Sequence, residues 1–323
     1  MMAYLDSELT AKHRWINRIH TVLLIGTMVV LLSVIGELIF GRGAFLWIGL
    51  ATGVLLAFSP QLPPRVVLRL YHASPISSWG STVLHRIAWE LSRRAGLSAA
   101  PALYYVPSAT ANAFAVGSRH QAAIALTDGL LRRLNMRELA GVMAHEITHL
   151  RHNDLRVMAL ADTVSRLTSL MSLFGQLLFL FNLPLLVMGY ATVSWIGLLL
   201  LVLAPTLAVL LQLALSRTRE FQADLGAAQL AGDPRGLASA LAKIDDQPQR
   251  WFERILHPNR QNPNPSILRS HPHVESRIDR LLSLEPGPAP AEELFAPDTI
   301  YRIPDMIPLI TRRPARHWSG VWY

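Results

Sequence analysis

The chain has 323 residues, of which 51% are hydrophobic and only 16% are charged. Together with a positive mean hydropathy, this composition lies outside that of ordinary soluble proteins and indicates a protein embedded in a lipid bilayer. The chain has no cysteine, which excludes disulfides, cysteine nucleophiles and thiolate metal sites, so any metal must be bound by His, Asp or Glu. The net charge of +8 comes from arginines scattered beside apolar runs, with no nucleic-acid-binding motif, so nucleic acid is not an expected partner.

Two apolar runs near the N-terminus predict a first transmembrane hairpin within residues 1–60, after a short cytoplasmic segment. Residues 21–40 suffice for one crossing at about 1.5 Å per residue. This run is longer than a signal-peptide core and has no small-x-small cleavage site after it, so we interpret it as a retained anchor. Residues 44–58 form a shorter run that prolines end. Glu37 lies near the far end of the first run.

The next segment, residues 61–166, has the composition of a globular domain and is the expected first part of the catalytic domain. One helix and three short strands are expected in it, at residues 85–96, 102–106, 111–116 and 122–126. Thr127 is expected to cap a short helix. Asn135 and Glu138 form a capping box, which predicts a longer helix from residue 136 to about residue 154.

A second transmembrane hairpin is predicted at residues 167–215. Residues 167–216 contain no Asp, Glu, Lys, Arg or His, and these 50 residues are too many for one crossing and fit two, joined by a turn near residues 189–194. One very hydrophobic soluble core is the alternative, but core helices rarely run so far without a polar face. Residues 216–284 are expected to be the second part of the catalytic domain, and residues 285–323 a proline-rich extension.

The arginines predict how the spans are oriented. They flank the spans on the N-terminal, central and C-terminal segments, whereas only Arg42 lies in the short loops opposite. By the positive-inside rule, the catalytic domain is therefore cytoplasmic. The predicted fold is mostly α with a small β-sheet (α+β), in a membrane protein with two transmembrane helical hairpins, that is, four spans.

The sequence His-Glu-Ile-Thr-His at residues 145–149 lies inside the predicted helix that begins at residue 136. Because residues four apart share a helix face, His145 and His149 can bind one tetrahedral zinc ion, with Glu146 close enough to act on a water held there. A chance occurrence of so short a motif is the alternative, so the surrounding residues must decide.

Zinc held by two histidines needs a third protein ligand and an open position for water. A third histidine in the extended pattern would stand at residue 155 with glycine at 152, but the chain has Leu155 and His152. Glu220 and Asp224 lie one helical turn apart after the second hairpin, so Glu220 can bind the metal while Asp224 accepts the ring N–H of a ligand histidine. A solvated helix face is the alternative for this acidic pair.

From about residue 20 to residue 283 the chain resembles the HtpX-like integral-membrane metallopeptidases, which are distant relatives of the CAAX prenyl endopeptidases. The resemblance rests on motifs in matching order, around two hairpins: Asn112-Ala113-Phe114-Ala115, His145 to His149 with Asp154, Arg219-Glu220-Phe221-Gln222-Ala223-Asp224, and Ser270-His271-Pro272 with Arg277-Ile278. It implies a gluzincin-like peptidase domain with Glu220 as third ligand of one zinc ion per chain. It also implies that an edge strand at Asn112, Ala113, Phe114 and Ala115 pairs with the substrate backbone.

The resemblance further implies an active-site role for His271 and Arg277, as oxyanion or substrate-binding groups, although the residues alone favour a solvated helix start. His152 is interpreted as a polar surface residue rather than a spare ligand, and His257 and His273 as loop residues. In the expected mechanism, Glu146 takes a proton from zinc-bound water and passes it to the departing amine.

Backbone recognition along an edge strand permits broad specificity, which suits polypeptide substrates such as damaged or misassembled membrane proteins in a bacterial plasma membrane. Three alternatives are weighed. A narrowly specific prenyl-protein-type processing peptidase is expected to have more than four spans. A membrane chaperone or scaffold with a relic metal site has no use for a base beside its metal. A transporter needs ionisable residues inside the membrane to form a path for its ion or substrate. The predicted hairpins lack such residues, with Glu37 as the exception.

Overall fold

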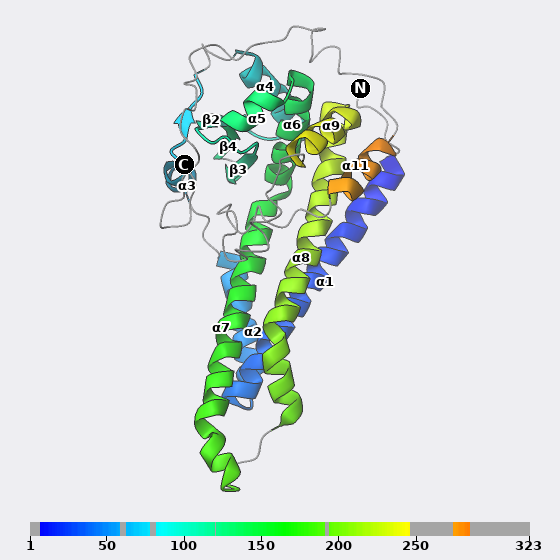
Figure 1. Ribbon diagram of the computed structural model, residues 1–323. Helices are drawn as coiled ribbons and strands as arrows, with labels where there is room; N and C mark the ends of the chain where they lie inside the picture. Colours follow the sequence, from blue (N-terminus) through cyan, green and yellow to red (C-terminus); the bar gives the residue numbers. More distant parts are fainter. Residues whose placement is uncertain are drawn as a thin grey trace. The chain divides into compact units, whose positions relative to one another are not determined.

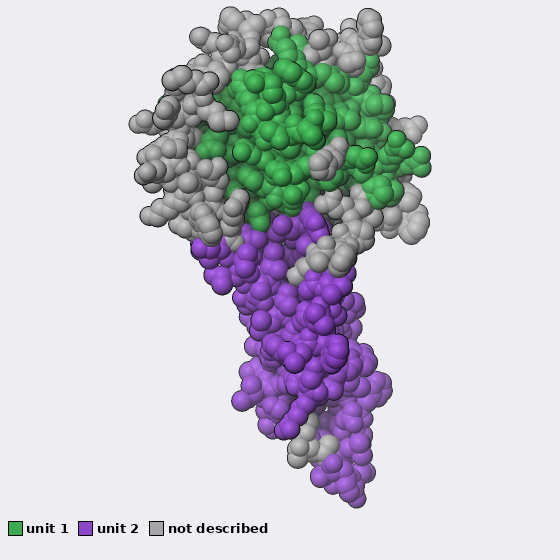
Figure 2. All heavy atoms as spheres, turned by 180° about the vertical axis from the view of Figure 1, so that it is seen from behind, with its two compact units in different colours: residues 1–13, 61–155, 219–323 green, residues 14–60, 156–218 purple. Residues whose placement is uncertain are grey.

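The computed structural model describes residues 7–58, 63–77, 82–119, 121–190, 194–245 and 274–284. The expectations for His257, His271, His273 and the proline-rich residues 285–323 fall outside these ranges. The chain divides into two compact units (Figure 2). One contains residues 1–13, 61–155 and 219–323, and the other contains residues 14–60 and 156–218.

The unit of residues 14–60 and 156–218 is built from helices only, in the part of it that the structure describes. The helices that supply it are α1 (Ser7–Phe40), α2 (Ala44–Phe58), α7 (Asp154–Val187) and α8 (Trp195–Ala231) (Figure 1). Among the described residues, three helical segments are long and apolar enough to cross a membrane: Ile19–Phe40, α7 and α8. The apolar part of α2, Ala44–Leu55, is shorter, so the structure supports three of the four predicted spans.

Large apolar side chains face outward on these helices, as a lipid-embedded surface requires. Phe181 is 76% exposed and Ile196 is 82% exposed. Inside the unit, Ile35, Leu201 and Ala204 form a buried cluster. Polar groups there are satisfied locally, because the Ser172 hydroxyl donates to the Leu201 carbonyl and the Gln176 amide donates to Ser172 Oγ at 3.0 Å.

Glu37 has a structural partner in this unit. Its carboxylate accepts hydrogen bonds from the backbone N–H groups of Gly43, at 3.3 Å, and Phe45, at 2.8 Å. Both donors lie at the N-terminus of α2, where free N–H groups and the helix dipole favour a negative charge. Glu37 therefore caps α2, which explains an ionisable residue here without a transport path.

The other unit contains a four-stranded sheet, in the order β1-β2-β4-β3. Its strands are β1 (Ser74–Pro75), β2 (Ala102–Val106), β3 (Ala113–Gly117) and β4 (Ala122–Thr127). β2 runs parallel to β4, whereas β3 runs antiparallel to β4 and forms the edge. The second predicted strand therefore starts at Ala113 instead of residue 111, and the backbone of Asn112 is tied to Thr127 just before it.

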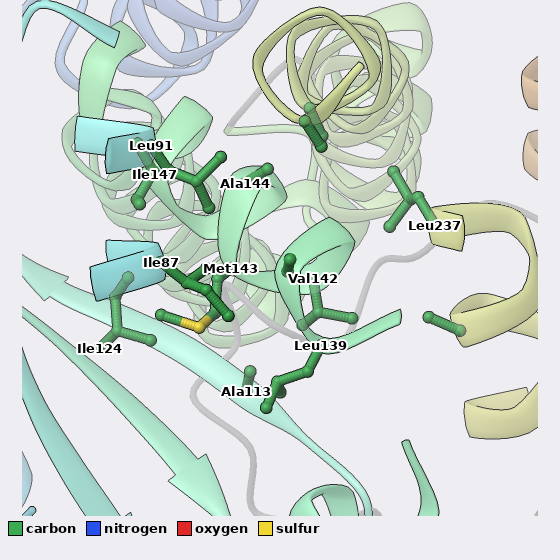
Figure 3. Close-up of a cluster of buried hydrophobic side chains, with 14 of the residues drawn as sticks. Ile87, Leu91, Ala113, Ile124, Leu139, Val142, Met143, Ala144, Ile147 and Leu237 are labelled. Atoms are coloured by element: carbon green, nitrogen blue, oxygen red, sulfur yellow. The ribbon is translucent and has the colours of Figure 1, made fainter. Parts of the chain in front are cut away.

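The helices of this unit are α3 (Pro64–Leu70), α4 (Thr82–Ala95), α5 (Asp128–Arg133), α6 (Met136–His152), α9 (Pro234–Asp245) and α11 (Val274–Leu282), with the ends of α7 and α8. α6 lies at the centre. Its buried side chains, Met143 and Ile147 among them, pack in one core with Ile87 and Leu91 of α4, Ile124 of β4 and Leu237 of α9 (Figure 3). α6 is therefore buried in the core of this unit.

Local signals define both ends of α6. The predicted capping box is present: the Asn135 side chain accepts from the Glu138 N–H, and Glu138 accepts from the Asn135 N–H, each at 2.9 Å. Glu138 also binds Ser239 Oγ, at 2.6 Å, and Lys243, which ties α6 to α9. The helix ends at His152 because Asn153 adopts a left-handed conformation with φ of 55°.

Candidate metal centre

The two histidines of the motif project from one face of α6 toward the same point. The Nε2 atoms of His145 and His149 lie 3.1 Å apart, and the two rings are nearly perpendicular, at 88°. Both nitrogens point inward because the i, i+4 spacing places the residues one turn apart on the same face. Their rings are largely buried, with side-chain exposures of 8% and 14%.

The carboxylate group of Glu220, from α8, completes a triangle with the two imidazole rings. Its Oε2 lies 3.5 Å from His145 Nε2, and its Oε1 lies 3.8 Å from His149 Nε2. Ligand atoms bound to one zinc ion at about 2.0–2.1 Å in tetrahedral geometry are separated by about 3.3 Å. Among the described residues, these three form the group whose ligand atoms all lie within 4.8 Å of one another. The arrangement fits a zinc ion.

Asp224 lies one turn after Glu220 and faces the other ring nitrogen of His145. The His145 Nδ1 to Asp224 Oδ1 distance is 3.0 Å, although the atoms are not aligned as a hydrogen bond. Arg277 of α11 binds both oxygens of Asp224, at 2.7 and 2.6 Å, and its Nη1 lies 3.0 Å from Glu220 Oε2. The almost fully buried Arg277 thus connects the candidate ligand Glu220 with the partner of His145.

A second set of contacts backs His149. Its Nδ1 lies 2.9 Å from Asp154 Oδ2, and the other oxygen of Asp154 accepts from Arg219 Nη1, also at 2.9 Å. Asp154 and Arg219 are both buried. Both ring nitrogens that point away from the triangle therefore face an aspartate, and each aspartate binds a buried arginine.

The charges around the triangle favour a cation. Four carboxylates, from Glu146, Asp154, Glu220 and Asp224, face two guanidinium groups, from Arg219 and Arg277. The acidic side chains outnumber the guanidinium groups in this buried site, and a cation offsets such an excess of acidic groups. Burial lowers the pKa of the His145 imidazole, but Asp224 and Glu220 outweigh it and raise the pKa to about 10. The donor set and the excess of acidic groups both fit a metal cation.

Glu146 lies beside the edge strand. Its Oε2 accepts a hydrogen bond from the backbone N–H of Ala115 in β3, at 2.9 Å. Ala113 and Ala115 belong to the core around α6, whereas Phe114 points to the opposite face, with its ring 4.8 Å from that of Tyr71. The structure therefore brings the edge strand next to Glu146. Any contact of Phe114 with a substrate must come from its backbone.

Comparison with known proteins decides the family. The model of Peptidase family M48 matches residues 78–285. The chain belongs to Peptidase family M48. The protease HtpX homolog of Desulfatibacillum aliphaticivorans is 33% identical over 85% of this chain and 93% of its own length. The protease HtpX homolog of Ralstonia nicotianae is 36% identical over 85% of this chain and 99% of its own length. Protease HtpX of Legionella pneumophila (strain Lens) is 32% identical over 83% of this chain and 99% of its own length.

Among solved structures, S. mikatae Ste24p resembles the chain with a TM-score of 0.37 and 19% identity, over 87% of this chain and 67% of that one. The family and the HtpX relatives, together with the apolar helices, make this M48 peptidase a membrane metalloprotease. The predicted resemblance to the HtpX-like peptidases is confirmed.

Sequence reasoning missed Asp154 and Arg219 as neighbours of the site in this M48 peptidase. Both residues were quoted in the resemblance without a role. The sequence separation of His149 and Asp154, five residues, was a usable signal for their contact. α6 ends between the two residues, so their contact does not follow from helix spacing. His152 is outside the triangle: it is half-buried, and burial lowers the pKa of its imidazole to about 4.

Proposed function

We propose that this M48 peptidase hydrolyses peptide bonds with one zinc ion per chain, bound by His145, His149 and Glu220. The observation that supports this most is the close approach of their ligand atoms. The two Nε2 atoms lie 3.1 Å apart, and each has an oxygen of the Glu220 carboxylate within 3.5 Å for His145 and 3.8 Å for His149. A buried set of two imidazoles and one carboxylate is the usual donor set of catalytic zinc in peptidases. It leaves a fourth position for water.

When bound, zinc supplies a Lewis acid for the scissile carbonyl and lowers the pKa of a bound water to about 7. We assign the role of general base to Glu146. One of its oxygens accepts from the Ala115 N–H, which orients the carboxylate and leaves the other oxygen for the water. Glu146 takes a proton from the water as the water oxygen adds to the carbonyl carbon. It then passes that proton to the amine as the C–N bond breaks.

The oxyanion needs a further donor, and His271 and Arg277 remain our candidates. His271 lies outside the described residues. The Arg277 guanidinium is already bound to Asp224 and Glu220, and burial lowers its pKa while Asp224, Glu220 and Glu146 raise it above the ordinary value. Arg277 therefore stays charged. Its contribution is a fixed positive charge beside Glu220.

We further propose that the substrate is an extended polypeptide that pairs with the edge of β3 in the segment Asn112, Ala113, Phe114 and Ala115. Within this segment, the Asn112 backbone is already held by Thr127 and the Ala115 N–H by Glu146. The position of β3 at the edge of the sheet and its contact with Glu146 support this. Recognition through backbone hydrogen bonds places few demands on side chains. Misfolded or damaged membrane proteins are the substrates that such breadth suits, and Asp224 is the proposed partner that fixes His145.

The membrane arrangement we propose has four spans in two hairpins, in a bacterial plasma membrane, with the catalytic domain in the cytoplasm. The 15 residues of α2 reach about 22 Å, which is shorter than the roughly 30 Å of a hydrocarbon core. A shorter span is accommodated by local thinning of the bilayer. The Glu37 cap at its N-terminus supports the hairpin.

The zinc proposal is tested by metal analysis of the full chain purified in detergent. We expect one zinc ion per chain and cleavage of casein. 1,10-Phenanthroline should remove both the zinc and the cleavage. Added zinc should restore both, because the contacts behind His145, His149 and Glu220 do not involve the metal. The non-chelating 1,7-isomer is the matched control. Full cleavage by protein freed of metal would refute the proposal.

Orientation is tested by cysteine labelling, to which a chain without cysteine is well suited. Single cysteines at the exposed Arg119 and Glu275 should react with a membrane-impermeant maleimide only from the cytoplasmic side. Cysteines at Arg42 and Tyr190 should react only from the opposite side. Labelling of all four positions from one side would contradict the four-span arrangement.

A further inference from the structure

We infer that Arg219, acting through Asp154, positions His149 to bind the metal. This inference rests on the proposed zinc site. The chain of contacts is continuous: Arg219 Nη1 to Asp154 Oδ1 at 2.9 Å, and Asp154 Oδ2 to His149 Nδ1 at 2.9 Å. His149 Nε2, on the far side of the ring, faces His145 Nε2 and Glu220. Arg219 is thus a positioning residue rather than a ligand.

The end of α6 makes this chain of contacts possible. Asn153 takes the left-handed conformation, and its N–H bonds the carbonyls of His149 and Leu150, which terminates α6. α7 then starts at the next residue, Asp154. This break in the helix at one residue leaves Asp154 beside the last turn of α6, with its Oδ2 2.9 Å from His149 Nδ1. Asparagine tolerates this conformation better than a β-branched residue.

Electrostatics explains why Asp154 needs the arginine. Asp154 is 1% exposed, and a buried carboxyl group needs a charged or hydrogen-bonding partner in place of water. Arg219 supplies that charge. Asp154, held through Oδ1 by Arg219, presents Oδ2 to His149 Nδ1, and this contact fixes the ring plane with Nε2 toward the metal site. Because Arg219 precedes Glu220 in α8, one turn of that helix carries both a proposed ligand and the group that orients another.

The two arginines of the site bind their aspartates differently. Arg277 holds both oxygens of Asp224 through Nε and Nη2. Arg219 binds one oxygen of Asp154 through Nη1, and its Nε has no hydrogen-bond partner within the described ranges. A bidentate pair depends on the planar guanidinium fork, whereas a single contact can be made by an ammonium group. Lysine should therefore replace Arg219 in part.

The test is the dissociation constant of zinc, measured by chelator competition on the full chain in detergent. Arg219→Met should weaken zinc binding about 10- to 100-fold, as changes behind a ligand histidine typically do. Arg219→Lys should recover a substantial part of this loss. Arg217→Met is the matched control, because Arg217 is exposed two residues earlier in the same helix, and it should bind zinc as the parent does. Unchanged zinc affinity in Arg219→Met would overturn the inference.

A double-mutant cycle shows whether Arg219 acts through Asp154. Asp154→Asn with Arg219→Met should bind zinc no more weakly than Asp154→Asn alone. Additive losses would overturn the inference, since they place the effect of Arg219 elsewhere, for example in Glu220. If Arg219→Met does not fold, Arg219→Lys with and without Asp154→Asn completes the same cycle. A parent chain that binds no zinc would refute the proposed function, whereas a zinc-binding parent with an unaffected Arg219→Met refutes this inference only.

Discussion

Glu146→Gln is expected to lower proteolysis by about 10³-fold or more while one zinc ion per chain remains bound. General-base catalysis by a positioned side chain contributes about 10²- to 10⁴-fold, and glutamine cannot take the proton. The amide is nearly isosteric, and its oxygen can still accept from the Ala115 N–H, so the local structure should persist. The ligand triangle does not include Glu146. Casein cleavage and zinc content, measured on the same preparation, check the prediction.

Glu275→Gln is the matched control, because Glu275 is exposed on α11 and the substitution is the same. It should leave both activity and zinc unchanged. Loss of zinc from Glu146→Gln would make Glu146 a ligand, and retained activity would remove it from catalysis. If the protein were a membrane scaffold with a relic metal site, Glu146→Gln should behave as the parent does in every assay. An inactive variant that co-purifies with uncut membrane proteins would favour the proposed substrates.

Replacing Glu220 is expected to have the other large effect. Glu220→Ala removes one of three proposed ligands, so zinc should fall well below one per chain and proteolysis should be lost with it. Added zinc should not restore activity, since the remaining two imidazoles do not provide a closed site. Metal analysis after gel filtration measures the loss of zinc. Casein cleavage at increasing zinc concentrations measures whether activity returns. Arg217→Ala, exposed in the same helix, is the control and should retain both.

Substitution of Asp224 is expected to have a milder effect than substitution of the proposed ligand Glu220. Asp224→Asn should weaken zinc binding about 10- to 100-fold and be rescued in part by excess zinc, because it changes the partner of His145 and not a ligand. Asparagine is the better substitution here than alanine, which would leave the buried Arg277 without its two-point partner. Normal zinc binding in Glu220→Ala, with an empty site in Asp224→Asn, would reverse the proposed ligand assignment.

Local sequence signals predicted much of the fold. Strands β2 and β4, the Thr127 cap and the capping box at Asn135 were found within a residue or two, because each depends on neighbours in the chain. The span prediction was less successful for α2. Its apolar run is as long as predicted, but 15 residues do not meet the length that distinguishes a crossing from a buried helix. Composition cannot decide such a case.

The sequence by itself placed His145 with His149, and Glu220 with Asp224, on shared helix faces, because the i, i+4 spacing is a property of helix geometry. The choice of Glu220 as third ligand came from the resemblance to the HtpX-like peptidases. Only the tertiary structure decided which acid faces which imidazole and which arginine compensates each acid. Arg219 and Asp154 are 65 residues apart, and Arg277 and Asp224 are 53 apart. Such pairings arise where buried charges from different helices must neutralise one another, and no local pattern in the chain encodes that requirement.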